Sequence, residues 1–131
     1  MKRTALLHAE LSEVVARLGH GDLLVIGDAG LPIPDGPRRI DLAVAPGVPR
    51  FHEVLAAVLS EMQVESAVVA DELAARNPDV EARLRQLVAA VPIARLPHED
   101  FKALTRSARA MVRTGECTPY ANVILRAGVV F

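Results

Sequence analysis

The sequence predicts an α/β fold, a single-domain layered sheet covered by helices over residues 1–131. Short apolar segments of strand length alternate along the chain with segments whose apolar residues recur at helical spacing. The length of 131 residues is near the usual size of one domain. No internal repeat, low-complexity tract or linker divides the chain, so one domain is expected.

The chain opens with an amphipathic helix and a buried strand. Apolar residues between Leu7 and Leu18 fall at helical spacing, and Gly19 ends the helix. Residues 23–26 (Leu-Leu-Val-Ile) have the length and composition of a short buried strand. The loop over 27–37 contains three prolines, which fix its backbone and make it a plausible site element.

The middle of the chain repeats this alternation. Residues 40–44 alternate like a strand, and a turn follows at 46–49. Apolar spacing predicts a helix over 51–62, and residues 64–70 read as the next strand.

Two more helices and up to three short strands are predicted after residue 70. Asn77–Pro78 opens a helix that extends to about Ala89, because proline is favoured in the first turn. A short strand over 93–96 and a helix over 98–112 follow. Residues 122–130 carry one or two strands, split at Gly128.

Composition excludes several classes of partner. The formal net charge of -1 gives no electrostatic case for nucleic acid or an anionic membrane. Aromatic residues make up 3%, with no Trp, so a stacking platform for single strands is missing. No apolar stretch approaches the roughly 20 residues of a membrane span. With one cysteine and no signal-peptide pattern, a cytoplasmic protein is expected.

An apolar fraction of 51% is slightly rich for a small monomer and favours contacts between subunits. The alternative is an alanine-rich, well-packed monomer.

The loop before the last strand carries the most informative polar residues. Gly115 and Pro119 bracket a loop that cannot continue a preceding helix. Tyr120 and Asn122 offer hydrogen-bond donors and acceptors without an obligatory charge. Such a pair suits a polyhydroxylated neutral ligand, unless both side chains merely stabilise the turn.

Four further residues could carry chemistry. His20 lies between two glycines past a helix end, and His98 opens a helix, so the two could divide acid and base roles. Lys102 lies on the same helix face as His98, and Asp28 directly follows a buried strand. The alternatives are ordinary loop or cap histidines and a solvated lysine. No metal-ligand spacing and no nucleotide-binding motif is present, so no metal and no cofactor are expected.

His20 and Asp28 flank the strand at 23–26. Eight steps of extended chain span on the order of 25 Å. If the segment is straight, one subunit cannot place both residues against one small ligand. Either the flanking loops curl back, or a neighbouring subunit supplies one residue, and we expect the site to lie between subunits.

Short motifs occur in order along nearly the whole chain: Leu18–Asp22, Asp28–Pro34, Arg39–Asp41, Glu61–Glu65, His98–Lys102, Gly115–Asn122 and Ala127–Phe131. Together these motifs resemble the ribose pyranase/fucose mutarotase family. The loop after Asp28 and the run ending at Asn122 look like the ribose branch, and the fucose branch differs in both places. The resemblance is loosest over residues 77–96.

The resemblance implies an isomerase that interconverts cyclic forms of a free sugar without a cofactor. The ribose branch converts the β-pyranose form of D-ribose to the β-furanose form that a ribokinase uses. Ring-built homo-oligomers, typically decamers with sites between subunits, are implied as well. By position, His20 resembles the proton donor, and the sugar-binding groups are matched by Asp28, His98, Lys102, Tyr120, Ala121 (through its backbone) and Asn122.

Three other functions stay open at this point. A mutarotase for another monosaccharide, such as L-fucose, would want an apolar pocket wall that the 3% aromatic content supplies poorly. A non-catalytic sugar-binding module would keep Tyr120 and Asn122 but would not need His20. A purely structural ring protein would bind no saccharide.

Overall fold

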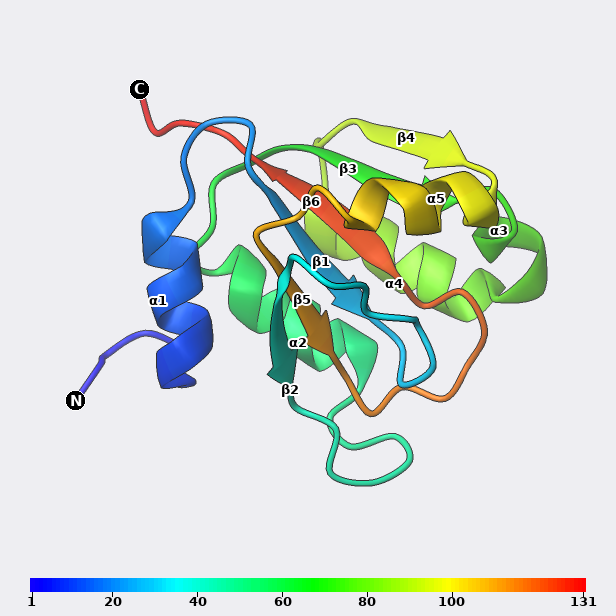
Figure 1. Ribbon diagram of the computed structural model, residues 1–131, viewed down its shortest axis with the longest axis horizontal. Helices are drawn as coiled ribbons and strands as arrows, with labels where there is room; N and C mark the ends of the chain where they lie inside the picture. The colour runs from blue at the N-terminus through cyan, green and yellow to red at the C-terminus, as the bar shows by residue number, and fades with distance from the viewer.

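The computed structural model describes all 131 residues as one six-stranded mixed sheet with helices on both faces (Figure 1). The predicted α/β layers are confirmed. The strands lie in the order β2-β5-β1-β6-β3-β4. The elements in chain order are α1 (Ala9–Arg17), β1 (Leu23–Gly27), β2 (Arg38–Asp41), α2 (Phe51–Leu59), β3 (Val64–Ala70), α3 (Leu73–Arg76), α4 (Pro78–Val88), β4 (Ile93–Leu96), α5 (His98–Thr105), β5 (Ala110–Arg113) and β6 (Val123–Ala127).

Strand β6 runs against the other five strands. It pairs antiparallel with β1 and β3, whereas β1–β5, β2–β5 and β3–β4 are parallel pairs. The first residue of β6 therefore lies at the edge of the sheet where the other five strands end. We call this the C-terminal edge. The opposite edge holds the start of β1 and the end of β6.

Strand β1 lies at the centre of the sheet and is buried along its whole length. Leu24 and Ile26 point into the larger core, to which α1, α2 and α4 contribute. Leu23 and Val25 point to the opposite face, into a smaller core under α5. Covering on both faces explains why this strand is an uninterrupted apolar run.

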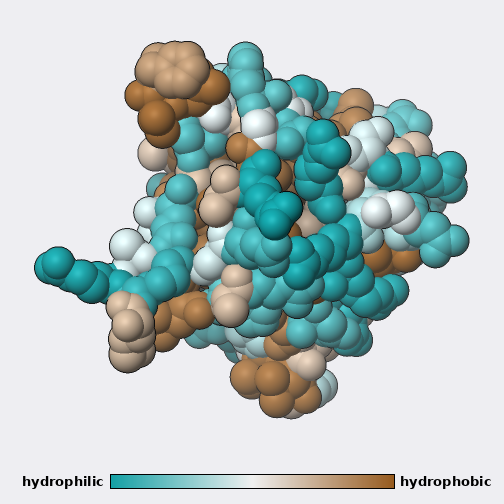
Figure 2. All heavy atoms as spheres, turned by 60° about the vertical axis from the view of Figure 1, so that its left-hand side comes forward, coloured by the Kyte–Doolittle hydropathy of each residue, from teal (hydrophilic) through white to brown (hydrophobic).

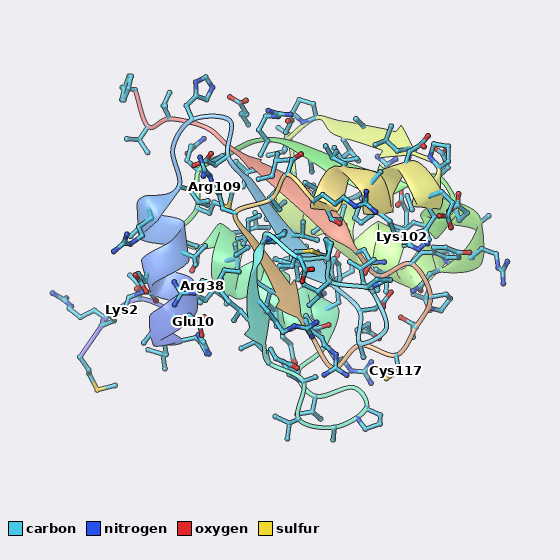
Figure 3. The ribbon with its side chains drawn as sticks, viewed as in Figure 1. Lys2, Glu10, Arg38, Lys102, Arg109 and Cys117 are labelled. Carbon is cyan, nitrogen blue, oxygen red and sulfur yellow. The ribbon has the colours of Figure 1, made fainter.

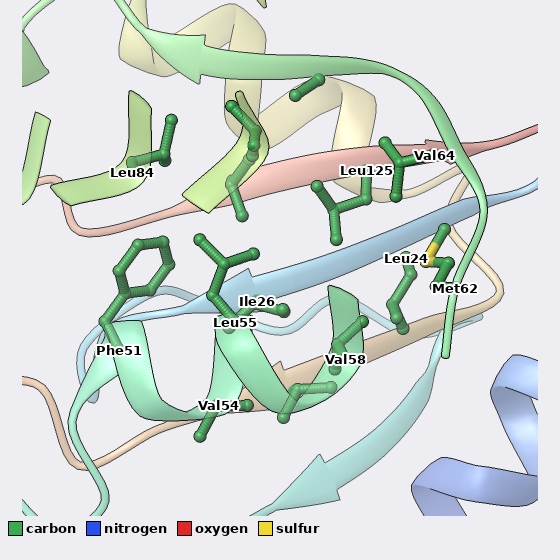
Figure 4. Close-up of a cluster of buried hydrophobic side chains, with 14 of the residues drawn as sticks. Leu24, Ile26, Phe51, Val54, Leu55, Val58, Met62, Val64, Leu84 and Leu125 are labelled. Carbon is green, nitrogen blue, oxygen red and sulfur yellow. The ribbon is translucent and has the colours of Figure 1, made fainter. Parts of the chain in front are cut away.

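Helix α2 contributes Phe51, Val54, Leu55 and Val58 to the larger core. Figure 4 shows the side chains of this helix lying over β1 and β6, with Phe51 and Leu55 almost completely buried. Burial of one such side chain stabilises the fold by about 1.5–3 kcal/mol. The smaller core fixes what lies in front of the sheet. Phe101 of α5 is fully buried there with Met111 and Leu31, which holds both α5 and the loop after β1 against the sheet.

The prediction of one helix over 98–112 is wrong in its second half. Helix α5 ends at Thr105, and residues 110–113 form β5 between β1 and β2. A short apolar run such as Ala110-Met111-Val112 fits a helix or a strand equally well, and here pairing with two neighbouring strands decides. The loop that begins at Thr114 therefore follows a strand and not a helix.

Other differences concern element boundaries. Strand β2 ends at Asp41 instead of reaching residue 44, and α2 ends at Leu59 instead of 62. The four-residue helix α3 was not predicted, and β6 is a single strand without a partner strand after Gly128. No helix combines the length and the apolar character that a membrane crossing requires.

Gly115 gives a first testable prediction, because a Cβ atom there would lie 2.3 Å from the carbonyl oxygen of Val48. Hydrogen bonds from Gly115 N–H to the Pro49 carbonyl (2.9 Å) and from Gly47 N–H to the Gly115 carbonyl hold the two loops in place. We expect Gly115→Ala to lower the free energy of unfolding by about 3 kcal/mol, measured by urea denaturation.

Gly19→Ala is the matched control, because the nearest atom to its Cβ would be 3.5 Å away. It should change the free energy of unfolding by less than about 0.5 kcal/mol. A similar loss in both variants, or none in Gly115→Ala, would contradict the close-contact argument.

Candidate active site

Polar side chains from three separate segments meet at the C-terminal edge. Asp28 comes directly after β1, His98 follows β4 and starts α5, and Asn122 directly precedes β6. In α/β proteins the carboxyl ends of the strands are the usual place for ligands. The reversed direction of β6 brings Asn122 and the neighbouring Tyr120 to this edge. We call Asp28, His98, Tyr120 and Asn122 the cluster.

The backbone of Asp28 is joined to Asn122. The Asp28 N–H donates a 2.7 Å hydrogen bond to Oδ1 of Asn122. The Gly30 N–H in turn donates to the Asp28 carboxylate (2.9 Å), so the turn after β1 fixes this side chain. The carboxylate therefore has a defined position before any ligand arrives.

Burial raises the pKa of the Asp28 carboxyl above its ordinary value. The hydrogen bond from the Gly30 N–H acts against this rise of the pKa, since it favours the charged carboxylate. A positive charge on His98 would act in the same direction. A carboxyl group in this environment is suited to exchanging a proton.

Two buried polar atoms of this cluster have no hydrogen-bond partner, Nδ1 of His98 and Nδ2 of Asn122. Asn122 is fully buried, and its other amide atom is occupied by Asp28. A buried polar group without a hydrogen-bond partner lowers the stability of a fold by about 1–3 kcal/mol, so such groups are normally paired. These two atoms are the groups that a polar ligand at this edge would satisfy.

The His98 ring is fixed by aromatic neighbours on two sides. It stacks on Phe101 with ring centroids 6.2 Å apart, and it meets Tyr120 edge-on at 5.1 Å. The His98 backbone N–H donates to both carboxylate oxygens of Glu72 (3.2 and 3.0 Å) at the start of α5. The ring orientation is therefore set by the protein.

Tyr120 has a left-handed backbone, with φ of 57°, which few residues other than glycine adopt. Its ring lies at His98, so the unusual backbone coincides with the cluster. The side chain of Ala121 is fully buried, which leaves its backbone as the part that a ligand could contact.

The structure does not place Lys102 against these residues. Lys102 lies one turn along α5, where its Nζ is 2.8 Å from the carboxylate of Glu99 (Figure 3). It lines a surface pocket of about 310 Å³ together with the loop over 32–34, and none of the cluster residues lines that pocket.

His20 lies at the opposite edge of the sheet. A ring nitrogen of His20 is 2.7 Å from the Glu65 carboxylate, and the side chain is 61% exposed. The five residues of β1 separate it from Asp28, an extended length of about 16 Å. The loops do not curl back, so within one chain His20 is not part of the cluster.

Four residues that support the cluster were not identified from the sequence. Glu72 caps α5 at His98, and Arg113 donates from Nε to the carbonyl of Ala29 (2.9 Å), next to Asp28. Asn77 and Glu116 hold the loop that carries Tyr120. Only Asn77 had a local signal, and the Asn-Pro pair indicated a helix start and not a contact.

Comparison with known proteins identifies the family. Residues 1–130 match the RbsD/FucU transport protein family. The chain belongs to this family. It is 66% identical to a D-ribose pyranase of Paracidovorax citrulli and 61% identical to one of Symbiobacterium thermophilum, with 100% of each chain covered.

Solved structures of the RbsD/FucU family have the same fold. The structure of Bacillus subtilis RbsD complexed with D-ribose matches over 100% of both chains, with a TM-score of 0.96 and 47% identity. A Streptococcus pneumoniae fucose mutarotase in complex with L-fucose also matches over 100% of both chains, with a TM-score of 0.83 and 27% identity. The resemblance found in the motifs is confirmed, and identity is higher on the ribose side.

The raised pKa of Asp28 predicts a pH-dependent effect of Asp28→Asn. The folded state keeps the Asp28 proton to a higher pH than the unfolded chain, so the wild type loses stability as the pH rises between those two pKa values. The variant has no such proton. We expect Asp28→Asn to be more stable than the wild type near pH ~7, and the difference to shrink toward pH ~4, in urea unfolding at one protein concentration.

Asp41→Asn is a control for which we expect the opposite change in stability at neutral pH. The Ala43 N–H and then Arg113 lower the pKa of Asp41, so its contribution to stability is present at neutral pH and is lost as the pH falls through that lowered pKa. This variant should be less stable than the wild type at neutral pH, with a deficit that shrinks in acid. The same trend in both variants would refute the assignment for Asp28.

Proposed function

We propose that this protein is a D-ribose pyranase, an isomerase that interconverts the β-pyranose and β-furanose forms of free D-ribose. The observation that carries the proposal is the cluster of Asp28, His98, Tyr120 and Asn122, with two buried polar atoms that await a partner. The full-length relatives named D-ribose pyranase and the related RbsD structure complexed with D-ribose support it.

The reaction requires only proton transfer and positioning. The pyranose ring opens when the anomeric hydroxyl loses a proton and the ring oxygen gains one as its bond to the anomeric carbon breaks. The open aldehyde rotates, and a different hydroxyl adds to the same carbon. That hydroxyl gives up its proton while the carbonyl oxygen takes one, so no net proton is consumed.

The cluster can supply these groups. Nδ2 of Asn122, Nδ1 of His98 and the Tyr120 hydroxyl hold sugar hydroxyls, and the backbone of Ala121 contributes between Tyr120 and Asn122. Asp28 or His98 exchanges the anomeric proton. A carboxyl with a raised pKa gives up and regains a proton with a smaller free-energy change than an ordinary aspartate at neutral pH. Lys102 is assigned a secondary contact with the sugar from one turn further along α5.

His20 is the proton donor to the ring oxygen, and it comes from a neighbouring subunit. Its place at the opposite edge, with 61% of the side chain exposed, lets its ring face another subunit's site beside Glu65. Figure 2 shows apolar groups that project from a mostly hydrophilic surface, and Val44, Val130 and Phe131 are at least 81% exposed. We propose a ring-built homo-oligomer, a decamer, whose contacts cover such groups.

The single domain of residues 1–131 is proposed to act in the cytoplasm, before a ribokinase. A kinase that phosphorylates ribose in its furanose form needs ATP, which is available inside the cell. Accelerated ring interconversion would keep that form available.

Magnetisation-transfer NMR of D-ribose tests the proposed activity. We expect purified protein to accelerate pyranose–furanose exchange of ribose by tenfold or more over buffer, since positioned acid–base groups give roughly 10²–10⁴-fold. L-Fucose is measured in parallel. Acceleration of fucose alone would make the protein a fucose mutarotase, and ribose binding without acceleration would make it a binding module.

Mixed oligomers test whether subunits share the site. His20→Ala and Asp28→Asn should each abolish exchange alone. Random co-assembly of the two variants in equal amounts should restore about one quarter of the wild-type rate. A site is intact only when its Asp28 comes from a His20→Ala subunit and its His20 comes from an Asp28→Asn subunit, and each of these choices has a probability of about one half. If both residues act within one chain, no site is intact and the mixture stays inactive.

A further inference from the structure

A buried asparagine outside the cluster holds the loop on which Tyr120 lies. Asn77 lies between α3 and α4 and is 8% exposed. Its side-chain Nδ2 donates to the hydroxyl of Thr118 (2.9 Å) and to the carbonyl of Pro119 (2.8 Å). Both amide hydrogens are thus committed to the two residues that directly precede Tyr120.

These contacts continue into a buried carboxylate. The Thr118 hydroxyl donates to Oε2 of Glu116 (3.0 Å), and Oε1 of Glu116 accepts from the Phe51 N–H at the start of α2 (3.2 Å). Glu116 is 4% exposed. We call Asn77, Glu116 and Thr118 the loop clamp, because together they tie the loop to the first turns of α2 and α4.

The loop clamp also reaches the turn that carries Asp28. The Ala29 N–H donates to the backbone carbonyl of Glu116 (2.8 Å). One loop therefore connects the clamp to both halves of the site, Asp28 on one side and Tyr120 on the other.

Tyr120 is where the clamp matters most. A left-handed backbone at a non-glycine residue is strained and persists only when the surroundings fix it. The last clamped atom, the carbonyl of Pro119, belongs to the peptide group that leads into Tyr120. Without this restraint the residue can relax, and its ring would leave its edge-on contact with His98.

We propose that Asn77 is a positioning residue of the sugar site, which keeps Tyr120 in its left-handed conformation and its ring at His98. The expected change in KM for D-ribose rests on the proposed function, whereas the position of the Tyr120 ring does not. The clamp raises the fraction of molecules in which the site is ready to bind, and affinity scales with that fraction.

The protein carries its own probe for this test. Tyr120 is the only tyrosine, and there is no tryptophan, so intrinsic fluorescence reports on this ring alone. The variants are Asn77→Ala, which removes both bonds to the loop, and Thr118→Val, which removes the hydroxyl at nearly equal volume. Glu81→Gln is the matched control, because Glu81 is 8% exposed on α4 but bonds to Arg85 and Arg95.

Asn77→Ala should raise KM for D-ribose by about tenfold and leave kcat of the NMR exchange within about threefold. Thr118→Val should raise KM by about threefold, because the bond to Pro119 remains. In both variants the Tyr120 emission without ribose should differ from that of the wild type. Glu81→Gln should lower thermal stability and keep the wild-type KM and emission.

The proposal is overturned if folded Asn77→Ala keeps the wild-type KM and Tyr120 emission, or if Glu81→Gln raises KM to the same extent. If Asn77→Ala does not fold, Thr118→Val decides by the same two readouts. If the wild type neither binds ribose nor accelerates its exchange, the proposed function fails. The Tyr120 emission of the variants then still decides whether the clamp sets the position of this ring.

Discussion

The site depends on the direction of one strand. Because β6 runs against its neighbours in the middle of the sheet, its first residues lie beside the last residues of β1. The hydrogen bond from the Asp28 N–H to Asn122 Oδ1 is the direct consequence, and it joins segments that are 94 residues apart in sequence. A parallel β6 would start at the other edge and would leave Asp28 without its amide neighbour.

The sequence predicted what depends on local pattern. The four apolar residues of β1 identified a strand covered on both faces, and the position of Asp28 after it indicated a site. Of the residues that the motifs predicted for the site, Asp28, His98, Tyr120 and Asn122 lie at one edge of the sheet, whereas His20 lies at the other. Strand β5 was missed because a run of three apolar residues has no period of its own, and its pairing with β1 and β2 is a tertiary property. The left-handed backbone of Tyr120 had no signal either, since no glycine or asparagine marks it.

The residues that hold the loop before Tyr120 could not be predicted either, because their contacts form only when distant segments pack together. Asn77 and Glu116 lie 39 residues apart, and each has an ordinary local role, one beside a helix start and one in a loop. Their common function appears only when α2, α4 and the last loop pack together. The segment in which the motif resemblance is loosest therefore still contributes a side chain that fixes the loop before Tyr120. Weak resemblance in a segment is not evidence that the segment is distant from the site.

The character of the cluster determines which ligands it can hold. Its unpaired atoms are an imidazole nitrogen and an amide nitrogen, and its one carboxyl has a pKa that burial raises. A phosphate or carboxylate ligand would meet the Asp28 carboxyl, while the nearby cations are already paired, Lys102 with Glu99 and Arg113 with Asp41. A neutral polyol would give the two buried atoms hydrogen-bond partners without adding charge to a partly desolvated site. Hydroxyl groups that reached those two atoms would supply the missing hydrogen bonds, so leaving the atoms unpaired costs stability and would favour binding.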